Sequence, residues 1–249
     1  MSAISSLARR LVNSSYARFG PDLRLFIADM VGRNAEESTY RRLAMAGFTP
    51  SGYIDVGAFK GDWTRLANRL LGDRPTLMIE AQSGLVPKLQ EYAETRTHAR
   101  VAHAVLSSTA GQKVTFYEMG TGSSIFAEAS NASRIAVDVD TQTLDDVAAD
   151  FIRTTDNIFL KIDVQGAELE VLGGAKNVLK KAALVQLEVA MLAYNEGAPL
   201  MPDVVAWMAD RGWLPTEISG FSRPSGPLVQ IDLLFARESS LLRPAFFRF

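Results

Sequence analysis

The stretch that decides the fold is Tyr53-Ile54-Asp55-Val56-Gly57-Ala58-Phe59-Lys60-Gly61-Asp62-Trp63-Thr64. A short apolar run ends in an acid, two glycines four residues apart follow, and apolar residues then recur with the spacing of one helix face. This pattern predicts a strand, a tight turn and a helix. Glycines permit backbone angles and close approaches that a Cβ forbids, so a ligand can lie against such a turn at the carboxyl end of the strand. We expect Asp55 at the edge of that ligand site.

The turn differs from the fingerprint of dinucleotide-binding proteins. It has two glycines where G-x-G-x-x-G has three, and its acid would repel a pyrophosphate. The next strand-like run, Thr76-Leu77-Met78-Ile79, ends in Glu80, 25 residues after Asp55. That is near the separation at which an acid on a second strand receives ribose hydroxyls. One acid for a cationic amino acid moiety and another for a ribose together point to S-adenosylmethionine.

Strand and helix patterns alternate from Tyr53 onward. The alternation predicts an α/β fold with a mostly parallel, doubly wound sheet, helices on both faces and a ligand beyond the carboxyl ends of the strands. The expected elements are strand 53–56, helix 62–71, strand 76–80, helix 84–94, strand 100–106, a helix around 143–151, strand 158–163, helix 167–180, strand 184–189 and helix 202–210.

Several blocks of sequence resemble the FkbM family of S-adenosylmethionine-dependent methyltransferases, in the family's order and spacing from about residue 50 to about residue 237. Two departures are Gln165, where the family usually has Glu, and Ala81-Gln82, where Pro is usual. The matching blocks are Ile54-Asp55-Val56-Gly57-Ala58 with Gly61 and Thr64, Ile79-Glu80-Ala81, Ala104-Val105-Leu106-Ser107 with Gly111, Thr143-Leu144-Asp145-Asp146, and Leu160-Lys161-Ile162-Asp163-Val164-Gln165-Gly166-Ala167-Glu168 with Val171-Leu172-Gly174-Ala175.

The resemblance implies a Rossmann-like class I methyltransferase fold, in which 213–218 and 228–236 form a final hairpin with an antiparallel last strand. It also implies O-methylation of a hydroxyl of a sugar, a glycolipid or a polyketide-like natural product. A lone His in a half-buried strand is more often structural, so both a structural and a cofactor-binding interpretation of His103 stay open. The expected cofactor-binding residues are Asp55, Gly57, Ala58, Phe59, Gly61, Glu80, Ala81, His103, Ala104 and Asp163.

Methyl transfer to an alcohol needs a base, and Asp163, at the end of strand 158–163, is the first candidate. The alternative is that Asp163 caps the following helix. Glu188 ends the adjoining strand, and we expect the two carboxylates, as catalytic residues, to converge. They could bind a divalent cation, but no acid or amide follows Glu188, so we expect substrate contact and no metal. Glu168 is expected to stabilise a helix N-terminus, and Lys161 to pair with a carboxylate.

Two other functions stay open. One is a nicotinamide-dependent oxidoreductase on a Rossmann-like fold, which the missing third glycine opposes. The other is a non-catalytic scaffold that keeps the cofactor fold, for which Gln165 is the one hint. The chain contains no G-x-S-x-G nucleophile elbow and no phosphate-binding G-x-x-x-x-G-K-[ST] motif.

Composition bounds the remaining choices. The 249 residues, 47% of them hydrophobic, suit one methyltransferase domain over 50–249 with an N-terminal helical extension over 1–49. A net charge of −2 and a pI near 5.8 disfavour nucleic acid as a partner. The absence of cysteine excludes disulfides, thiolate metal sites and a Cys nucleophile. No apolar run approaches the roughly 20 residues of a membrane span and no signal-peptide pattern is present, so we expect a cytoplasmic protein.

Two segments lie outside the alternating pattern. An apolar face over 4–12 predicts an amphipathic helix that packs on the domain or on a neighbouring subunit of a homo-oligomer; peripheral contact with a membrane is the alternative. Further helices are expected over 21–31 and 34–47. Between strands 100–106 and 158–163, the alternating runs 114–118 and 135–139 flank a Gly/Ser loop that is either a substrate gate or an ordinary connection.

Overall fold

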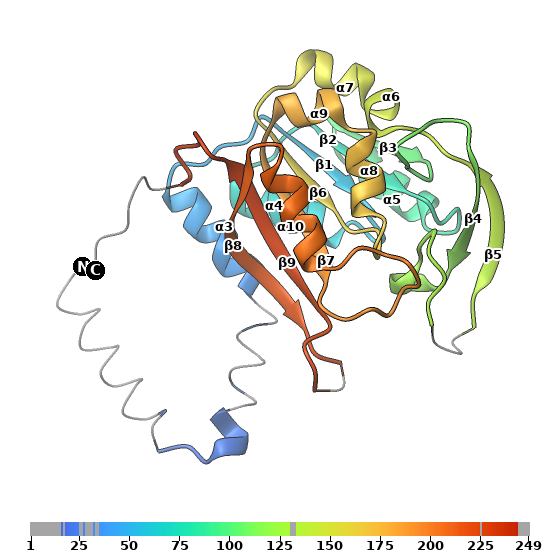
Figure 1. The fold of residues 1–249 in the computed structure, drawn as a ribbon. Coiled ribbons are helices and arrows are strands. Elements are labelled where there is room, and N and C mark those ends of the chain that lie inside the picture. Colours follow the sequence, from blue (N-terminus) through green and yellow to red (C-terminus); the bar gives the residue numbers. More distant parts are fainter. Residues whose placement is uncertain are drawn as a thin grey trace.

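The computed structural model describes residues 16, 18–24, 27, 32, 35–129, 133–224 and 226–243. Within these residues a seven-stranded sheet is covered by helices on both faces (Figure 1). Its strands are β1 (Gly52–Val56), β2 (Thr76–Glu80), β3 (Ala99–His103), β6 (Ile158–Ile162), β7 (Ala182–Ala190), β8 (Trp213–Ser222) and β9 (Gln230–Arg237). The helices are α3 (Ala35–Met45), α4 (Asp62–Leu71), α5 (Val86–Glu94), α6 (Leu144–Val147), α7 (Ala149–Thr154), α8 (Glu168–Gly173), α9 (Lys176–Lys181) and α10 (Met201–Ala209).

The strand order in the sheet is β3-β2-β1-β6-β7-β9-β8. The neighbours from β3 to β7 all pair in parallel, whereas β9 runs antiparallel to both β7 and β8. These directions confirm the predicted doubly wound α/β sheet with an antiparallel last strand. The chain builds outward from β1 to β3 and then returns to place β6 on the other side of β1. A ligand site is therefore expected where the order reverses, between β1 and β6.

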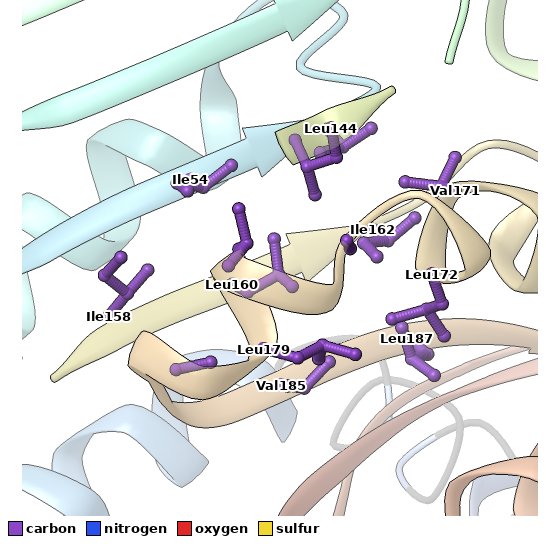
Figure 2. Packing of buried hydrophobic residues seen from close by; sticks show 14 of the residues in the cluster. Ile54, Leu144, Ile158, Leu160, Ile162, Val171, Leu172, Leu179, Val185 and Leu187 are labelled. Atoms are coloured by element: carbon purple, nitrogen blue, oxygen red, sulfur yellow. The ribbon is translucent and has the colours of Figure 1, made fainter. Parts of the chain in front are cut away.

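The two faces of the sheet have separate apolar cores, because successive side chains of a strand point to opposite faces. Ile54 belongs to the larger core, which packs under helices α6 to α10 and is drawn in Figure 2. Its neighbour Tyr53 belongs to the other core, with Trp63 of α4 and Tyr40 of α3. Such burial of apolar side chains contributes about 25 cal/mol per Å². Both cores hold the strand ends of β1 and β6 in fixed positions.

Helix α3 is tied to the sheet by polar contacts as well. The amide Nε2 of Gln186 on β7 donates to Glu36 Oε1 at 2.8 Å, and the Tyr40 hydroxyl donates to Gln186 Oε1 at 2.5 Å. The Trp63 ring nitrogen donates in turn to the Tyr40 hydroxyl. The buried side chains of Tyr40 and Gln186 thus find hydrogen-bond partners in each other and in Glu36 and Trp63, as burial requires. Helix α3 matches the helix expected over 34–47, while the expected helix over 4–12 lies outside the described residues.

The prediction of a single helix over 167–180 is wrong, because the segment forms two helices, α8 and α9. A Cβ on Gly174 would lie 2.5 Å from the Ser107 carbonyl oxygen, and the Gly174 carbonyl accepts from the Asp145 amide at 2.9 Å. These contacts divert the backbone from the helical path. The Asp145 carboxylate then caps α9 by accepting from the amides of Asn177 and Val178. The helix expected around 143–151 is likewise divided into α6 and α7.

A two-stranded antiparallel sheet, β4 (Lys113–Glu118) with β5 (Ile135–Asp140), follows β3. It confirms the two alternating runs predicted there, and Figure 1 shows it standing beside the main sheet. The Gly/Ser loop begins with the short 3-10 helix η1 (Gly120–Gly122), and backbone hydrogen bonds between Tyr117 and Ser124 fold it back on β4. No helix in the part of the chain that the structure describes is long and apolar enough to cross a membrane.

Candidate active site

A cavity of about 680 Å³ opens at the carboxyl ends of the central strands. Its wall includes the residue that ends or follows each of these strands, and the Gly/Ser loop covers it from the side. This volume lies in the usual range for small-molecule and cofactor sites. The wall residues at the strand ends are Val56 and Gly57 after β1, Glu80 and Ala81 at β2, Ala104 after β3, Asp163 after β6 and Glu188 near the end of β7.

The glycine turn has the left-handed backbone that its sequence predicts. Gly57 and Gly61 both have φ of 75°, and Phe59 between them has φ of 50°, which is uncommon for a residue with a side chain. A Cβ on Gly57 would lie 1.9 Å from the carbonyl oxygen of Asp163. Gly57 is therefore required by the close approach of the β1 and β6 chain ends. Gly57 also lines the cavity, and its expected contact with a ligand stays a prediction.

Glu80 holds the turn in shape. Its Oε2 accepts from the Phe59 amide at 2.6 Å, and its Oε1 accepts from the Gln82 amide at 2.8 Å. The carboxylate is buried and lines the cavity. Charge-assisted bonds of this kind are stronger than neutral ones, so Glu80 is a fixed acceptor at the expected ribose position.

The sequence suggested that Asp55 lies at the edge of the cavity, but in the structure it lies behind the cavity wall. It shares the sheet face of Tyr53, is 0% exposed and is not among the lining residues. Its Oδ2 accepts from the Thr64 hydroxyl at 2.7 Å, and its Oδ1 lies 4.0 Å from Lys161 Nζ. Burial raises the pKa of Asp55, with Lys161 opposing the rise. The contribution of Asp55 to the site thus passes through Lys161.

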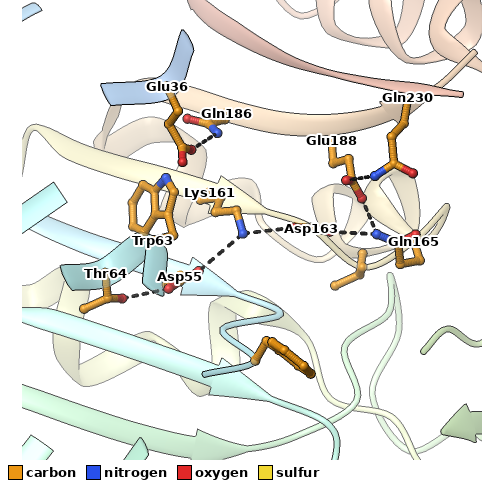
Figure 3. A network of polar contacts seen from close by, with 12 residues as sticks. Glu36, Asp55, Trp63, Thr64, Lys161, Asp163, Gln165, Gln186, Glu188 and Gln230 are labelled. Atoms are coloured by element: carbon orange, nitrogen blue, oxygen red, sulfur yellow. Dashed lines mark hydrogen bonds and ion pairs between the residues drawn. The ribbon is translucent and has the colours of Figure 1, made fainter. Parts of the chain in front are cut away.

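Lys161 carries a buried positive charge between two carboxylates. Its Nζ lies 3.0 Å from Asp163 Oδ2, which confirms the expected ion pair (Figure 3). Burial disfavours the ammonium, but Asp163 and Asp55 outweigh burial and raise the pKa of Lys161. Burial would raise the pKa of Asp163 too, yet Lys161 lowers it below its ordinary value. Asp163 is therefore ionised at neutral pH.

Asp163 and Glu188 converge, as predicted, and Gln165 joins them. Gln165 Nε2 donates to Asp163 Oδ1 at 3.1 Å and also to Glu188 Oε2, while Gln230 Nε2 donates to Glu188 Oε1 (Figure 3). Gln165 has a left-handed φ of 53°, a costly conformation for a residue with a side chain. Burial and the charge of Asp163 raise the pKa of Glu188 well above its ordinary value. The two carboxyls thus differ sharply in proton affinity, which is typical of an acid–base pair.

Glu168, and not Asp163, stabilises the turn before α8. Its Oε1 accepts from the amides of Val164 and Gly166 at 3.2 and 3.0 Å, as its expected role at a helix N-terminus requires. Burial raises the pKa of Glu168 to about 7, against these bonds. The residue before α8, Ala167, makes no side-chain cap. The capping alternative for Asp163 therefore has no support, since both Asp163 oxygens bond to side chains elsewhere.

Besides Asp55, two more of the expected cofactor residues do not reach the cavity. The His103 ring nitrogen Nε2 lies 2.9 Å from the carbonyl oxygen of Ala81, and neither His103 nor Gly61 lines the wall. This contact fits the structural interpretation of His103. Ala58, Phe59, Ala81 and Ala104 do line it. Among the described residues, no group of three or more His, Cys, Asp or Glu side chains is placed to hold a metal ion.

Gln230, Tyr194 and Glu128 are among the wall residues that sequence reasoning missed. Gln230 starts β9, whose antiparallel return places it beside Glu188. The Tyr194 hydroxyl lies 3.3 Å from Gln165 Oε1 and 3.4 Å from Gln230 Oε1. None of the three belongs to a motif. Only the register of β9 on β7 would have indicated Gln230 in advance.

A parallel sheet with its ligand site at the switch point, a glycine turn after β1 and an acid at the end of β2 defines the Rossmann-like methyltransferases. Within that class, the model of the methyltransferase FkbM domain matches residues 55–214. The chain belongs to the FkbM methyltransferase family, and its methyl donor is S-adenosylmethionine. This membership answers the nicotinamide alternative, because the family transfers methyl groups.

Solved structures with a similar fold are distant. The magnesium protoporphyrin IX methyltransferase of Synechocystis PCC 6803 is 12% identical, with a TM-score of 0.47 over 82% of this chain and 80% of that one. The 1,6-didemethyltoxoflavin-N1-methyltransferase of Burkholderia thailandensis is also 12% identical, with a TM-score of 0.46 over 95% and 91%. No curated protein matches the sequence. Likeness at this level says nothing about the methyl acceptor of the present chain.

Proposed function

We propose that this protein is an O-methyltransferase of the cytoplasm whose acceptor is a hydroxyl of a sugar, a glycolipid or a polyketide-like natural product. The observation that carries the proposal is the position of Asp163. Its carboxylate lines the cavity, is kept ionised by Lys161 and is oriented by Gln165 next to Glu188. An ionised carboxylate fixed at a strand end can accept the proton of a bound alcohol.

The residues around the turn fit the cofactor. The cavity is large enough for a nucleoside with an amino acid arm, and Glu80 offers a carboxylate, held by two backbone amides, of the kind that receives ribose hydroxyls. Ala58, Phe59, Ala81 and Ala104 would form the adjoining wall. When bound, S-adenosylmethionine supplies a methyl group on a positively charged sulfur, and the carboxylate of Asp163 on the same wall is complementary to that charge.

Asp163 and Glu188 have different tasks in this proposal. Asp163, with its lowered pKa, is the ionised partner that would hydrogen-bond the acceptor hydroxyl and accept its proton. Glu188, with its raised pKa, holds its own proton more tightly and adjoins Asp163 through Gln165, where it would contact the acceptor. Lys161 and Gln165 are positioning residues, since they act on the acceptor only through Asp163.

The test is Asp163→Asn assayed with labelled cofactor on a panel of sugars, glycolipids and polyketide-like alcohols, with the methyl ether identified by mass spectrometry. Turnover should fall by roughly 10²–10⁴, the usual contribution of a positioned acid or base, while the calorimetric affinity for S-adenosylhomocysteine, whose sulfur is uncharged, changes little. Asp140→Asn is the matched control, because Asp140 pairs with Lys113 at an exposed site. Unchanged turnover per folded molecule in the Asp163 variant would transfer the role to Glu188.

A further inference from the structure

On the side of β6, β7 and β9, the cavity wall carries carboxylates, amides and hydroxyls, and we call this part of the wall the acceptor end. The chain there comes from the ends of β6 and β7, the start of β9 and two connecting segments. These side chains offer many hydrogen-bond acceptors and several donors. The lining residues of this acceptor end are Glu128, Asp163, Gln165, Glu188, Tyr194, Ser222 and Gln230.

The acceptor end has no positive charge to offer an anionic group. Among the described residues of the wall, Lys60 and Lys161 are the cationic ones. The Lys161 ammonium is already held by Asp163 at 3.0 Å and lies 4.0 Å from Asp55. Lys60 belongs to the glycine turn, where its Nζ stands 5.0 Å from the centre of the Phe59 ring. A carboxylate or phosphate on the acceptor would therefore find no unpaired cationic side chain at this end among the described residues of the wall.

The carboxylates of this end exceed what the cofactor needs. In the proposed function Glu80 would serve the ribose and Asp163 would serve the acceptor hydroxyl, which leaves Glu188 and Glu128. Glu188 is fixed by the amides of Gln165 and Gln230. Fixed hydrogen-bond acceptors beside amide donors match the hydroxyl groups of a polyol, each of which donates and accepts.

Glu128 is fixed over the acceptor end although it lies on a connection. The Ala129 amide donates to the Tyr194 carbonyl at 2.9 Å, and the Glu196 amide donates to the Ala127 carbonyl at 2.8 Å. A guanidinium nitrogen of Arg134 donates to the backbone carbonyl of Glu128, but Arg134 does not line the cavity. The Glu128 side chain therefore contributes its charge to the wall.

Tyr194 contributes a hydroxyl group to the acceptor end. Burial raises the pKa of its phenol first, and the charges of Glu188, Glu168, Asp163 and Glu128 raise it further. The Tyr194 hydroxyl therefore stays protonated and can donate a hydrogen bond. An anionic group on the acceptor would add a further negative charge beside Glu128.

We propose that the methyl acceptor is an uncharged polyol, such as a neutral sugar residue, and that Glu128 sets the selection against acceptors carrying a carboxylate or a phosphate. This inference rests on the proposed O-methyl transfer. Beyond the proposed function, it specifies that the acceptor is uncharged and that Glu128 discriminates against negatively charged acceptors.

The experiment measures binding, so that it does not depend on turnover. The full-length protein is saturated with S-adenosylhomocysteine and titrated by calorimetry with matched pairs, the p-nitrophenyl glucoside and galactoside against the corresponding glucuronide and galacturonide. We expect the neutral member of a pair to bind at least tenfold more tightly. Glu128→Gln should narrow that ratio roughly tenfold, about 1.4 kcal/mol. The control Glu196→Gln, exposed on the adjoining segment and outside the wall, should leave it unchanged.

The outcomes separate the two proposals. The inference is overturned if a uronide binds as tightly as its neutral partner, or if none of the neutral glycosides binds. It is also overturned if the matching amino sugar binds more tightly than the neutral glycoside. If the ratio of neutral-glycoside affinity to uronide affinity is unchanged in Glu128→Gln, Glu128 does not set the charge selection. Selective binding of the neutral glycoside without methylation of any alcohol would support the charge selection and contradict O-methyl transfer.

Discussion

Gly57 and Asp163 meet backbone to backbone where β1 and β6 end, because a Cβ on Gly57 would lie 1.9 Å from the Asp163 carbonyl oxygen. We therefore expect Gly57→Ala to displace Asp163 as well as the turn. The left-handed φ of 75° adds a strain of order 1 kcal/mol. The melting temperature should fall, and both cofactor affinity and turnover should fall with it, as measured by thermal melts, calorimetry and assay.

The control for this prediction is Gly84→Ala. A Cβ there would have open space around it, since no heavy atom lies within 4 Å. Its melting temperature and affinity should stay near those of the wild type. If Gly57→Ala behaves like Gly84→Ala, the two strand ends are not as close as the structure shows.

Lys161→Met should destabilise the protein by about 3–5 kcal/mol, the usual effect of leaving buried charges without their partner. Asp55 would lose the cation 4.0 Å away, and Asp163 would lose the one that lowers its pKa. Denaturant unfolding measures the loss. The surface pair Lys113–Asp140, with side chains 82% and 62% exposed, provides the control, because Lys113→Met should cost at most about 1 kcal/mol.

A double variant sharpens this prediction. Adding Asp55→Asn to Lys161→Met removes one of the two orphaned acids, so part of the lost stability should return. Equal losses in Lys161→Met and Lys113→Met, or no recovery in the double variant, would contradict a buried charge cluster.

Glu80→Gln should weaken S-adenosylmethionine by on the order of 1–3 kcal/mol, because charge-assisted hydrogen bonds to the ribose become neutral ones. The variant keeps one oxygen to accept from the Phe59 amide, so the turn should keep its shape. Calorimetry measures the affinity, and Glu94→Gln at the exposed end of α5 is the control. Normal cofactor affinity together with reduced turnover would place Glu80 on the acceptor side.

Much of the fold was predictable, because the positions of apolar residues along the sequence follow the side of each strand or helix that is buried. Helix α4 and strand β2 have the predicted bounds, since a buried strand reads as an apolar run and a half-buried helix as an apolar stripe. The division between α8 and α9 was not predictable. It depends on how closely Ser107 approaches Gly174, a contact between segments distant in the sequence.

The site was predictable only in part. Asp163 and Glu188 end adjacent parallel strands, which brings their side chains together whatever the loops do. Asp55 was misplaced, because it shares the sheet face of Tyr53 and so points into the protein under α4. The sequence alone does not say which face of β1 meets the cavity. Assignment of residues 1–49 to an extension stays a prediction.

The stability of the protein should fall as pH rises from about 4.5 to about 7, and Glu168 should be one cause. Burial raises the pKa of Glu168 from 4.5 to about 7. The folded protein then holds this proton more tightly than the unfolded chain, so its contribution is complete below pH 4.5 and is lost as pH rises through about 7. The contribution is on the order of 3 kcal/mol.

Glu168→Gln isolates this effect, because a Gln oxygen can still accept from the amides of Val164 and Gly166 while the side chain never ionises. Denaturant unfolding at pH 5 and pH 8 gives the comparison. The free energy of unfolding should drop less between the two values in the variant than in the wild type, by on the order of 3 kcal/mol. Glu196→Gln, at an exposed acid, should reproduce the wild-type drop. The same pH dependence in Glu168→Gln and in the wild type would show that Glu168 is ionised in the folded protein throughout this range.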